Sequence, residues 1–143
     1  TKPVLRHGKE PVIKYTSSKR ESVMEIYNVV EEIRKEGKHS IAIITKTFKE
    51  AKVLEKDIKR YTNLEYTIIK GNEKSAPSTD VVIIPVYLTK GLEFDGTIIY
   101  NPLESVYENN LLNQRLLYVG LTRALHYEYI IAEGKLSQNI KTN

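Results

Sequence analysis

Short runs of apolar residues alternate with longer segments in which apolar residues recur every three or four positions. The short runs predict β-strands over residues 12–15, 41–44, 65–69, 81–84, 97–100 and 127–132. The runs at 41–44 and 81–84 hold only apolar residues, which is typical of strands covered on both faces. The alternation therefore predicts a sheet with helices on both sides.

The longer segments predict three helices. Ser18 with Glu21 and Thr47 with Glu50 have the spacing of a capping box, in which a hydroxyl and a carboxylate satisfy unpaired backbone N–H groups. Gly37 is expected to end the first helix, and the third is expected from residue 109 to about residue 123. The residues predicted to face inward are Val23, Ile26, Tyr27, Val30 and Ile33, then Ala51, Leu54, Ile58 and Tyr61, then Leu112, Leu116, Leu117 and Leu121.

Strands that alternate with helices predict an α/β fold with a mostly parallel sheet and helices on both faces. We expect one lobe over residues 18–134, a lead-in segment over 1–17 and a frayed tail over 135–143. Residues 71–80, rich in Gly, Asn, Ser and Pro, predict an exposed loop. Ligands of such sheets bind beyond the carboxyl ends of the strands, so the chemistry is expected after Ile84 and before Tyr127.

Composition narrows the classes of protein. None of the 143 residues is cysteine, which excludes disulfides and thiolate metal sites and makes a cytoplasmic location the default. The three histidines are scattered, so we expect no metal site. No apolar run approaches the roughly 20 residues that span a bilayer, so we expect no membrane partner. The net charge of +4 permits a nucleotide or nucleic acid as partner without requiring one.

The chain lacks the parts of a self-contained nucleoside triphosphatase. Such an enzyme needs a phosphate-binding loop, a carboxylate for Mg²⁺ and a cation that senses the γ-phosphate. Residues 37–40, Gly-Lys-His-Ser, match only the end of a phosphate-binding loop, and they follow a predicted helix where the motif requires a strand. No predicted strand ends in paired acidic residues. We therefore expect that this chain alone does not hydrolyse ATP.

Two segments contain candidates for the cation that senses the γ-phosphate. Residues 90–95 read Lys-Gly-Leu-Glu-Phe-Asp, and residues 115–124 read Arg-Leu-Leu-Tyr-Val-Gly-Leu-Thr-Arg-Ala. In this order and at this spacing, the pair resembles the fifth and sixth motifs of UvrD/Rep-type superfamily-one helicases. The predicted strand and helix over residues 41–55 resemble the opening of the second motor lobe, so the resemblance covers about residues 40–132. It implies a RecA-like lobe, related to P-loop NTPases but without a P-loop of its own.

The resemblance also implies roles for single residues. Arg123 matches the catalytic arginine that reaches the γ-phosphate on the other lobe, where a forked and permanently charged guanidinium suits the charge of the transition state. Glu93 matches the glutamate that accepts a hydrogen bond from the ribose, and Gly91 the glycine that lets the backbone approach the nucleotide. Lys90, Arg115, Tyr118 and Thr122 match positions that support the nucleotide site in the family's two motifs. ATP and Mg²⁺ would be held mainly by an N-terminal lobe.

Simpler interpretations stand beside these roles. Gly91 could serve only a turn, Glu93 could be merely solvated, and Arg123 could complement the dipole of the preceding helix. Packing or capping would explain Lys90, Arg115 and Thr122, and Tyr118 is expected in the core rather than at a contact.

The sequence also departs from the family. The earlier motifs are absent, so we expect the chain to be part of a longer protein whose N-terminal lobe is its partner. Pro85 and Tyr87 stand where helicases carry a threonine and a histidine near DNA, and a large accessory subdomain is reduced to residues 71–80. These features resemble the HelD-type branch associated with RNA polymerase, which implies ATP-dependent remodelling or release of the polymerase.

Two functions remain open from the sequence. In the first, the chain is the C-terminal motor lobe of an ATP-dependent DNA helicase or translocase, with Tyr87 and Lys46 as candidate nucleic-acid contacts. In the second, it is a non-catalytic module that retains the fold and binds nucleic acid or RNA polymerase. A basic stripe on the second predicted helix could follow phosphates or simply be solvated, and it consists of Lys49, Lys52, Lys56 and Lys59.

Overall fold

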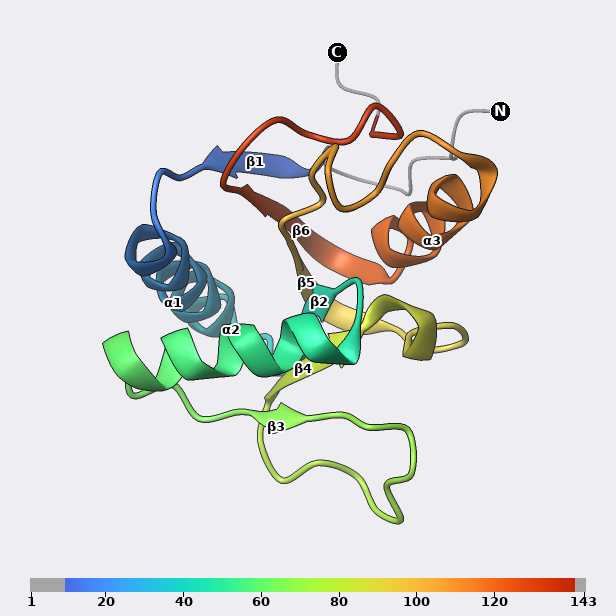
Figure 1. Cartoon of the computed structure of the whole chain (residues 1–143). Helices are drawn as coiled ribbons and strands as arrows, with labels where there is room; N and C mark the ends of the chain where they lie inside the picture. The colour runs from blue at the N-terminus through green and yellow to red at the C-terminus, as the bar shows by residue number, and fades with distance from the viewer. Residues whose placement is uncertain (1–9, 141–143) are drawn as a thin grey trace.

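A six-stranded parallel sheet forms the centre of the computed structural model, which describes residues 10–140 (Figure 1). The strand order is β1-β6-β5-β2-β4-β3. The strands are β1 (Val12–Tyr15), β2 (Ile41–Thr45), β3 (Thr67–Ile68), β4 (Val81–Pro85), β5 (Phe94–Tyr100) and β6 (Ala124–Ala132). The helices are α1 (Lys19–Lys35), α2 (Phe48–Tyr61) and α3 (Leu111–Leu121), with a short 3-10 helix, η1 (Val86–Leu88). The predicted α/β fold is confirmed.

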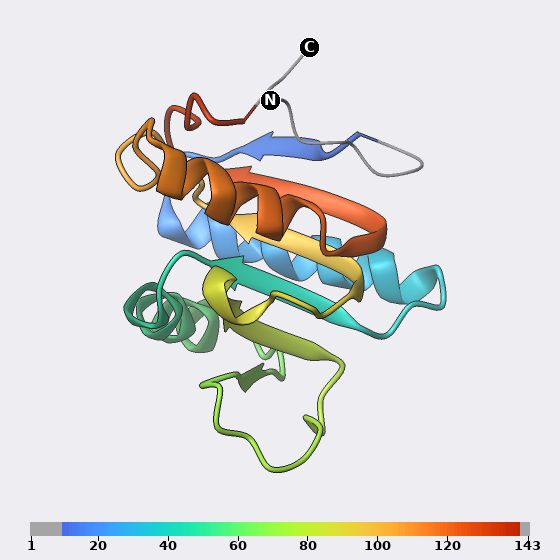
Figure 2. The same cartoon turned by 90° about the vertical axis from the view of Figure 1, so that its right-hand side faces the viewer.

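Helices cover both faces of the sheet, as the all-apolar strands indicate (Figure 2). Alternate residues of a strand point to opposite faces, so Ile43 packs in the core under α1 and α2 while Ile44 packs in the core under α3 and η1. Both side chains are fully buried. Because β2 lies between β5 and β4 and is covered on each side, its first four residues, 41–44, are all apolar, and only the last, Thr45, is polar.

The first two helices begin at the predicted capping residues. Ser18 Oγ accepts a hydrogen bond from the backbone N of Glu21 at 3.1 Å, and Thr47 Oγ1 accepts one from the backbone N of Glu50 at 3.0 Å. The two carboxylates reach one residue further back than a capping box requires. Glu21 accepts from the N–H of Ser17 and Glu50 from that of Lys46, so each helix start also orders the residue ahead of its cap.

The third helix differs from its prediction. It begins at Leu111, after Asn110, whose Oδ1 accepts a hydrogen bond from the backbone N of Asn113 at 2.9 Å. Leu112 is 69% exposed and Tyr118 is 41% exposed, so neither belongs to the core as expected. Leu117 is buried as predicted, and Leu116 and Leu121 pack against the core as predicted. Asn113 and Gly120 complete the side that faces the sheet. A Cβ on Gly120 would lie 3.2 Å from Val86 Cγ2, which shows how closely η1 packs against α3.

The chain ends also differ from expectation. β1 coincides with the strand predicted over residues 12–15, and it pairs with β6, so part of the expected lead-in segment belongs to the sheet. Residues 135–140, expected to be frayed, pack over the loop between β5 and α3: Leu136 bridges Leu103, and Ser137 Oγ donates to Tyr107 O at 2.7 Å. Buried Asn139 donates to the same carbonyl. Expectations for residues 1–9 and 141–143 lie outside the described residues.

Candidate functional site

The two motif segments meet where β5 and β6 begin. Phe94 and Ala124 are paired in the sheet, and the backbone N of Phe94 donates to Arg123 O at 3.0 Å. Glu93 and Arg123 therefore precede neighbouring strands and lie side by side in the backbone. The expected position beyond the carboxyl ends of the strands is wrong for this pair. The reason is that η1 and the following turn carry the chain back from the carboxyl end of β4, while α3 carries it back from that of β5.

A tight turn delivers Glu93 to this position. The backbone N of Leu92 donates to Thr89 O at 2.9 Å, and Gly91 has a φ of +84° at the third position, as in a type II turn. Side chains with a Cβ rarely adopt this φ, so glycine is required by the backbone conformation. A Cβ on Gly91 would meet no atom within 4 Å. Gly91 therefore lies in a turn, and the surface above it is open to a ligand.

The guanidinium of Arg123 ties the turn to the end of α3. Its Nε donates to Val119 O at 2.9 Å, its Nη2 to Thr122 Oγ1 at 3.1 Å and its Nη1 to Leu92 O at 3.2 Å. It therefore complements the carboxyl end of the helix, as the simpler interpretation expected. These bonds use three of its five N–H donors. One N–H on each terminal nitrogen remains, and the side chain is only half-buried.

The neighbouring side chains divide into those that position Arg123 and those that face solvent. Thr122 Oγ1 lies 2.8 Å from Tyr118 O and 3.1 Å from Val119 O, so it caps α3 while it accepts from Arg123. Among the described residues, the exposed side chain of Glu93 has no hydrogen bond or ion pair. The same holds for the exposed side chains of Lys90 and Arg115. The site thus presents an exposed carboxylate and a guanidinium held by three hydrogen bonds, on two segments whose backbones are neighbours.

Comparisons with known proteins agree with this arrangement. A sequence profile of the family described as UvrD-like helicase C-terminal domain matches residues 80–131, which contain both motif segments. The solved structure of the C-terminal domain of a possible DNA helicase from Lactobacillus plantarum WCFS1 is 30% identical, with a TM-score of 0.80. That match covers 92% of this chain and 79% of the other. The chain belongs to the UvrD-like helicase C-terminal domain family. A comparison with curated proteins found no match.

The two candidate nucleic-acid contacts in this helicase domain differ in exposure and in their contacts. Tyr87 lies on η1 and is 55% exposed. Lys46 is half-buried, its Nζ donates to Val106 O at 2.6 Å, and it lies 5.3 Å from the centroid of the Tyr107 ring. Its ammonium therefore holds the loop between β5 and α3, which explains its position without nucleic acid.

The basic stripe of the helicase domain is partly neutralised. Lys52 and Lys59 lie 2.9 Å and 3.5 Å from the carboxylate of Glu55. Hydrogen bonds from Lys52 and from the Tyr66 hydroxyl lower the pKa of Glu55 to about 2. The stripe is therefore a weaker phosphate-binding surface than its four lysines suggested, because half of them already face a carboxylate.

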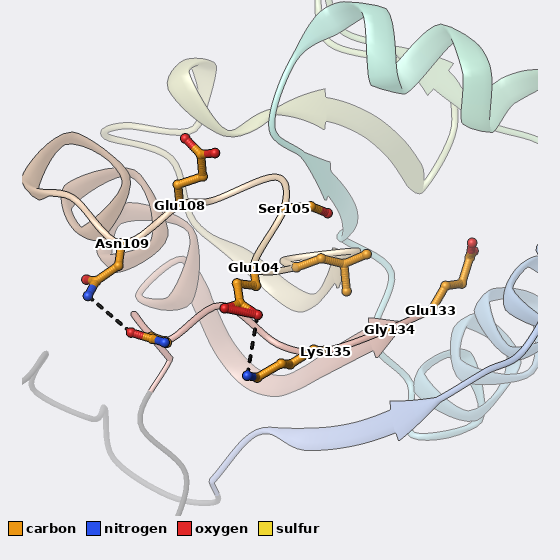
Figure 3. Close-up of a pocket in the computed structure, with 9 residues that line it drawn as sticks. Glu104, Ser105, Glu108, Asn109, Glu133, Gly134 and Lys135 are labelled. Carbon is orange, nitrogen blue, oxygen red and sulfur yellow. Dashed lines mark hydrogen bonds and ion pairs between the residues drawn. The ribbon is translucent and has the colours of Figure 1, made fainter.

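A hollow of about 670 Å³ lies at the opposite end of the sheet, beyond β5 and β6 (Figure 3). Its lining includes Glu104, Glu108 and Glu133, and its one lysine, Lys135, lies 3.5 Å from Glu104. Carboxylates repel phosphates, so this hollow does not suit a nucleotide. The part of the chain that the structure describes has no cluster of three or more His, Cys, Asp or Glu arranged to hold a metal ion. Nor do residues 10–140 contain a helix long and apolar enough to cross a membrane.

Proposed function

We propose that this domain is the C-terminal motor lobe of an ATP-dependent DNA helicase or translocase. In this proposal it completes an ATP site whose phosphate-binding loop and Mg²⁺ ligands belong to an N-terminal lobe. The supporting observation is that Glu93 and Arg123 are neighbours across β5 and β6 and that both reach the surface. The residues fit a nucleotide: an acceptor for the ribose, an open glycine turn and a cation for the γ-phosphate.

Arg123 is suited to stabilise the transition state of ATP hydrolysis. Its bonds to Val119, Leu92 and Thr122 fix the guanidinium, so little reorganisation is needed when charge develops on the phosphoryl oxygens. Its two remaining N–H groups can donate to those oxygens as a fork. Bound Mg²⁺ and the N-terminal lobe supply the charge that holds the phosphates. The isolated domain keeps Arg123 but lacks the phosphate-binding loop and the Mg²⁺ ligands that would hold ATP next to it. We therefore expect the isolated domain not to hydrolyse ATP.

The same contacts couple hydrolysis to movement. Glu93 and Arg123 bind the nucleotide from this lobe while the phosphate-binding loop holds it from the other, so ATP draws the lobes together. Loss of the γ-phosphate removes the partner of Arg123 and favours opening. Repeated closing and opening would move the protein along DNA, with Tyr87 as the exposed aromatic available for stacking on a base. Action on RNA polymerase remains a prediction from the sequence.

Glu93→Ala in the full-length protein tests the nucleotide contact. The carboxylate is expected to accept a hydrogen bond from the ribose, and bonds to charged groups are worth about 1.5–3 kcal/mol. We therefore expect ATP to bind about 10- to 100-fold more weakly. The wild type should prefer ATP over 2′,3′-dideoxy-ATP, and the variant should lose that preference. Titration of a fluorescent nucleotide, with the unlabelled ones as competitors, measures both effects.

Glu104→Ala is the matched control, because it removes a glutamate from the hollow at the opposite end of the sheet. It should leave both affinities unchanged. If Glu93→Ala retained the wild-type preference for the ribose hydroxyls, the assignment of Glu93 would be wrong. The alternative function, a non-catalytic interaction module, predicts that neither nucleotide binds tightly to the full-length protein.

A further inference from the structure

β6 contains a β-bulge just after Arg123. Two residues of β6, Leu125 and His126, stand opposite a single residue of β5, Asp95. The regular pairs on either side of the bulge are Phe94 with Ala124 and Gly96 with Tyr127. Consecutive side chains of a regular strand point to opposite faces, yet Leu125 and His126 are both exposed. A bulge inserts one extra residue into a strand and re-aims the side chains next to it.

This extra residue sets the register between Glu93 and Arg123. With the bulge in place, the backbone N of Phe94 donates to Arg123 O, and the next side chain, that of Ala124, is buried. A shift of one residue along a strand turns its side chains to the other face of the sheet. Without the bulge, Arg123 would therefore move by one position relative to Glu93. The alignment of the candidate site depends on the bulge keeping its shape.

The β5 side of the bulge is held firmly. Phe94 packs against the core under α3 and η1. The backbone N of Gly96 donates to Ser40 O at 3.1 Å, and a Cβ on Gly96 would lie 2.7 Å from Ile33 Cδ1, so α1 lies directly against this part of the strand. Asp95, between these two residues, is thus fixed through both of its neighbours.

The side chain of His126 connects the bulge to this fixed residue. Its Nε2 lies 3.9 Å from Asp95 Oδ1, and the two form an ion pair when the imidazole is protonated. Both side chains are partly exposed, at 46% for His126 and 28% for Asp95. Pairs in such surroundings add little to the stability of a whole domain, so the consequence of this pair is local.

We propose that Asp95 and His126 are positioning residues of the candidate site: their pair keeps the bulge of β6 in shape and so holds Arg123 in register with Glu93. This rests on the proposed function and adds two residues that do not touch ATP. The guanidinium of Arg123 bonds both to Val119 O in α3 and to Leu92 O in the turn before β5. It is therefore aligned only while the segments before β5 and β6 keep this register.

The test is a double-mutant cycle in the full-length protein, with Asp95→Ala, His126→Ala and the double variant. We expect kcat for ATP hydrolysis to fall about tenfold in each single variant, because Arg123 is then aligned in a smaller fraction of the molecules. The double variant should fall by the same factor, because the second substitution removes a pair that is already broken. KM for ATP should stay within about twofold of wild type, since the turn that carries Glu93 is intact.

Two further substitutions at position 126 test the need for a cation. His126→Lys supplies a permanent positive charge that can reach Asp95, so it should retain most of the turnover. His126→Gln keeps a polar side chain without the charge, and it should lose as much turnover as His126→Ala. Full turnover in His126→Gln would overturn the role of the ion pair.

The matched control is the pair of Glu104 and Lys135, which lie 3.5 Å apart. This pair is also exposed, and it joins the segments that follow β5 and β6, at the other end of the same two strands. Glu104→Ala and Lys135→Ala should each leave kcat unchanged. The unfolding temperature should stay within a few degrees of wild type in all of these variants, because each removes only a partly exposed ion pair.

Amide hydrogen exchange of the full-length protein gives a readout that does not depend on activity. The N–H of Phe94, which donates to Arg123 O, should exchange faster in Asp95→Ala and His126→Ala and at the wild-type rate in the two control variants. An unchanged kcat, or losses that add up in the double variant, would overturn the positioning role whatever the exchange rates. Loss of turnover in Arg123→Ala would then leave the proposed function standing, whereas retained turnover in Arg123→Ala would remove both.

Discussion

Replacing Arg123 with alanine in the full-length protein is expected to slow ATP hydrolysis by about 10³- to 10⁵-fold. The affinity for ATP should fall far less, because in the proposed site the other lobe would hold the ground-state phosphates and Glu93 would hold the ribose. The difference follows from where charge appears: the guanidinium donors matter most when negative charge spreads over the transferred phosphoryl oxygens. Steady-state turnover and nucleotide titration on the same preparation separate the two effects.

A structural effect of the same substitution must be distinguished from a catalytic one. Arg123 donates to Val119 O and Leu92 O, so its loss also uncaps α3 and loosens the turn. Arg123→Lys keeps a cation that can bond to the helix carbonyls, so the unfolding temperature should return toward wild type. Turnover should not return, because an ammonium cannot hold three protein acceptors and still present a fork. Turnover within threefold of wild type in Arg123→Ala would contradict the assignment.

The sequence predicts the central strands well because a strand that is buried on both faces has apolar side chains on both faces. β2 and β4 contain no charged side chain, and the structure places them in the middle of the sheet. The two capping residues were equally predictable, since Ser18 and Thr47 act within a few residues of their own positions. Interactions that are local or that fill the core can be predicted from one sequence.

The position of the candidate site was not predictable in the same way. The strands β5 and β6 were expected from residues 97 and 127, but they begin at Phe94 and Ala124. Asp95 and His126, which interrupt the apolar pattern, pair across these early strand residues, with His126 Nε2 3.9 Å from Asp95 Oδ1. Glu93 and Arg123 precede both the predicted and the observed starts, so they lie at the amino ends of β5 and β6. The general rule for α/β sheets directs attention to the carboxyl ends of the strands and therefore misplaces this pair.

The orientation of α3 was also ambiguous from sequence. Leucine occupies positions 111, 112, 116, 117 and 121, so its apolar residues surround the helix and the helical period selects no single face. Contact with Val86 at Gly120, a tertiary interaction, decides which face is buried. Leu111 and Leu112 are thus left exposed on the side of α3 that faces away from the sheet.

The second large effect is expected from Gly91→Val in the full-length protein. Gly91 has a φ of +84°, which a β-branched residue adopts only at considerable cost, so the turn from Thr89 to Leu92 should change its conformation. That change moves Leu92 O, which accepts from Arg123, and the adjacent Glu93. Displacement of catalytic groups by about 1 Å can cost on the order of 100-fold in rate. We therefore expect turnover to fall about 100-fold and ATP to bind more weakly.

Gly37→Val separates this effect from general destabilisation. Gly37 has a φ of +80°, and a Cβ there would also meet no atom within 4 Å, so the strain is matched. It follows α1, which covers the opposite face of the sheet, and none of its hydrogen bonds involves the candidate site. Both variants should lose similar stability, about 1–3 kcal/mol in the free energy of unfolding. Only Gly91→Val should lose turnover. Equal losses of turnover would mean that Gly91 serves the fold alone, and the open surface above it would then have no part in holding the nucleotide.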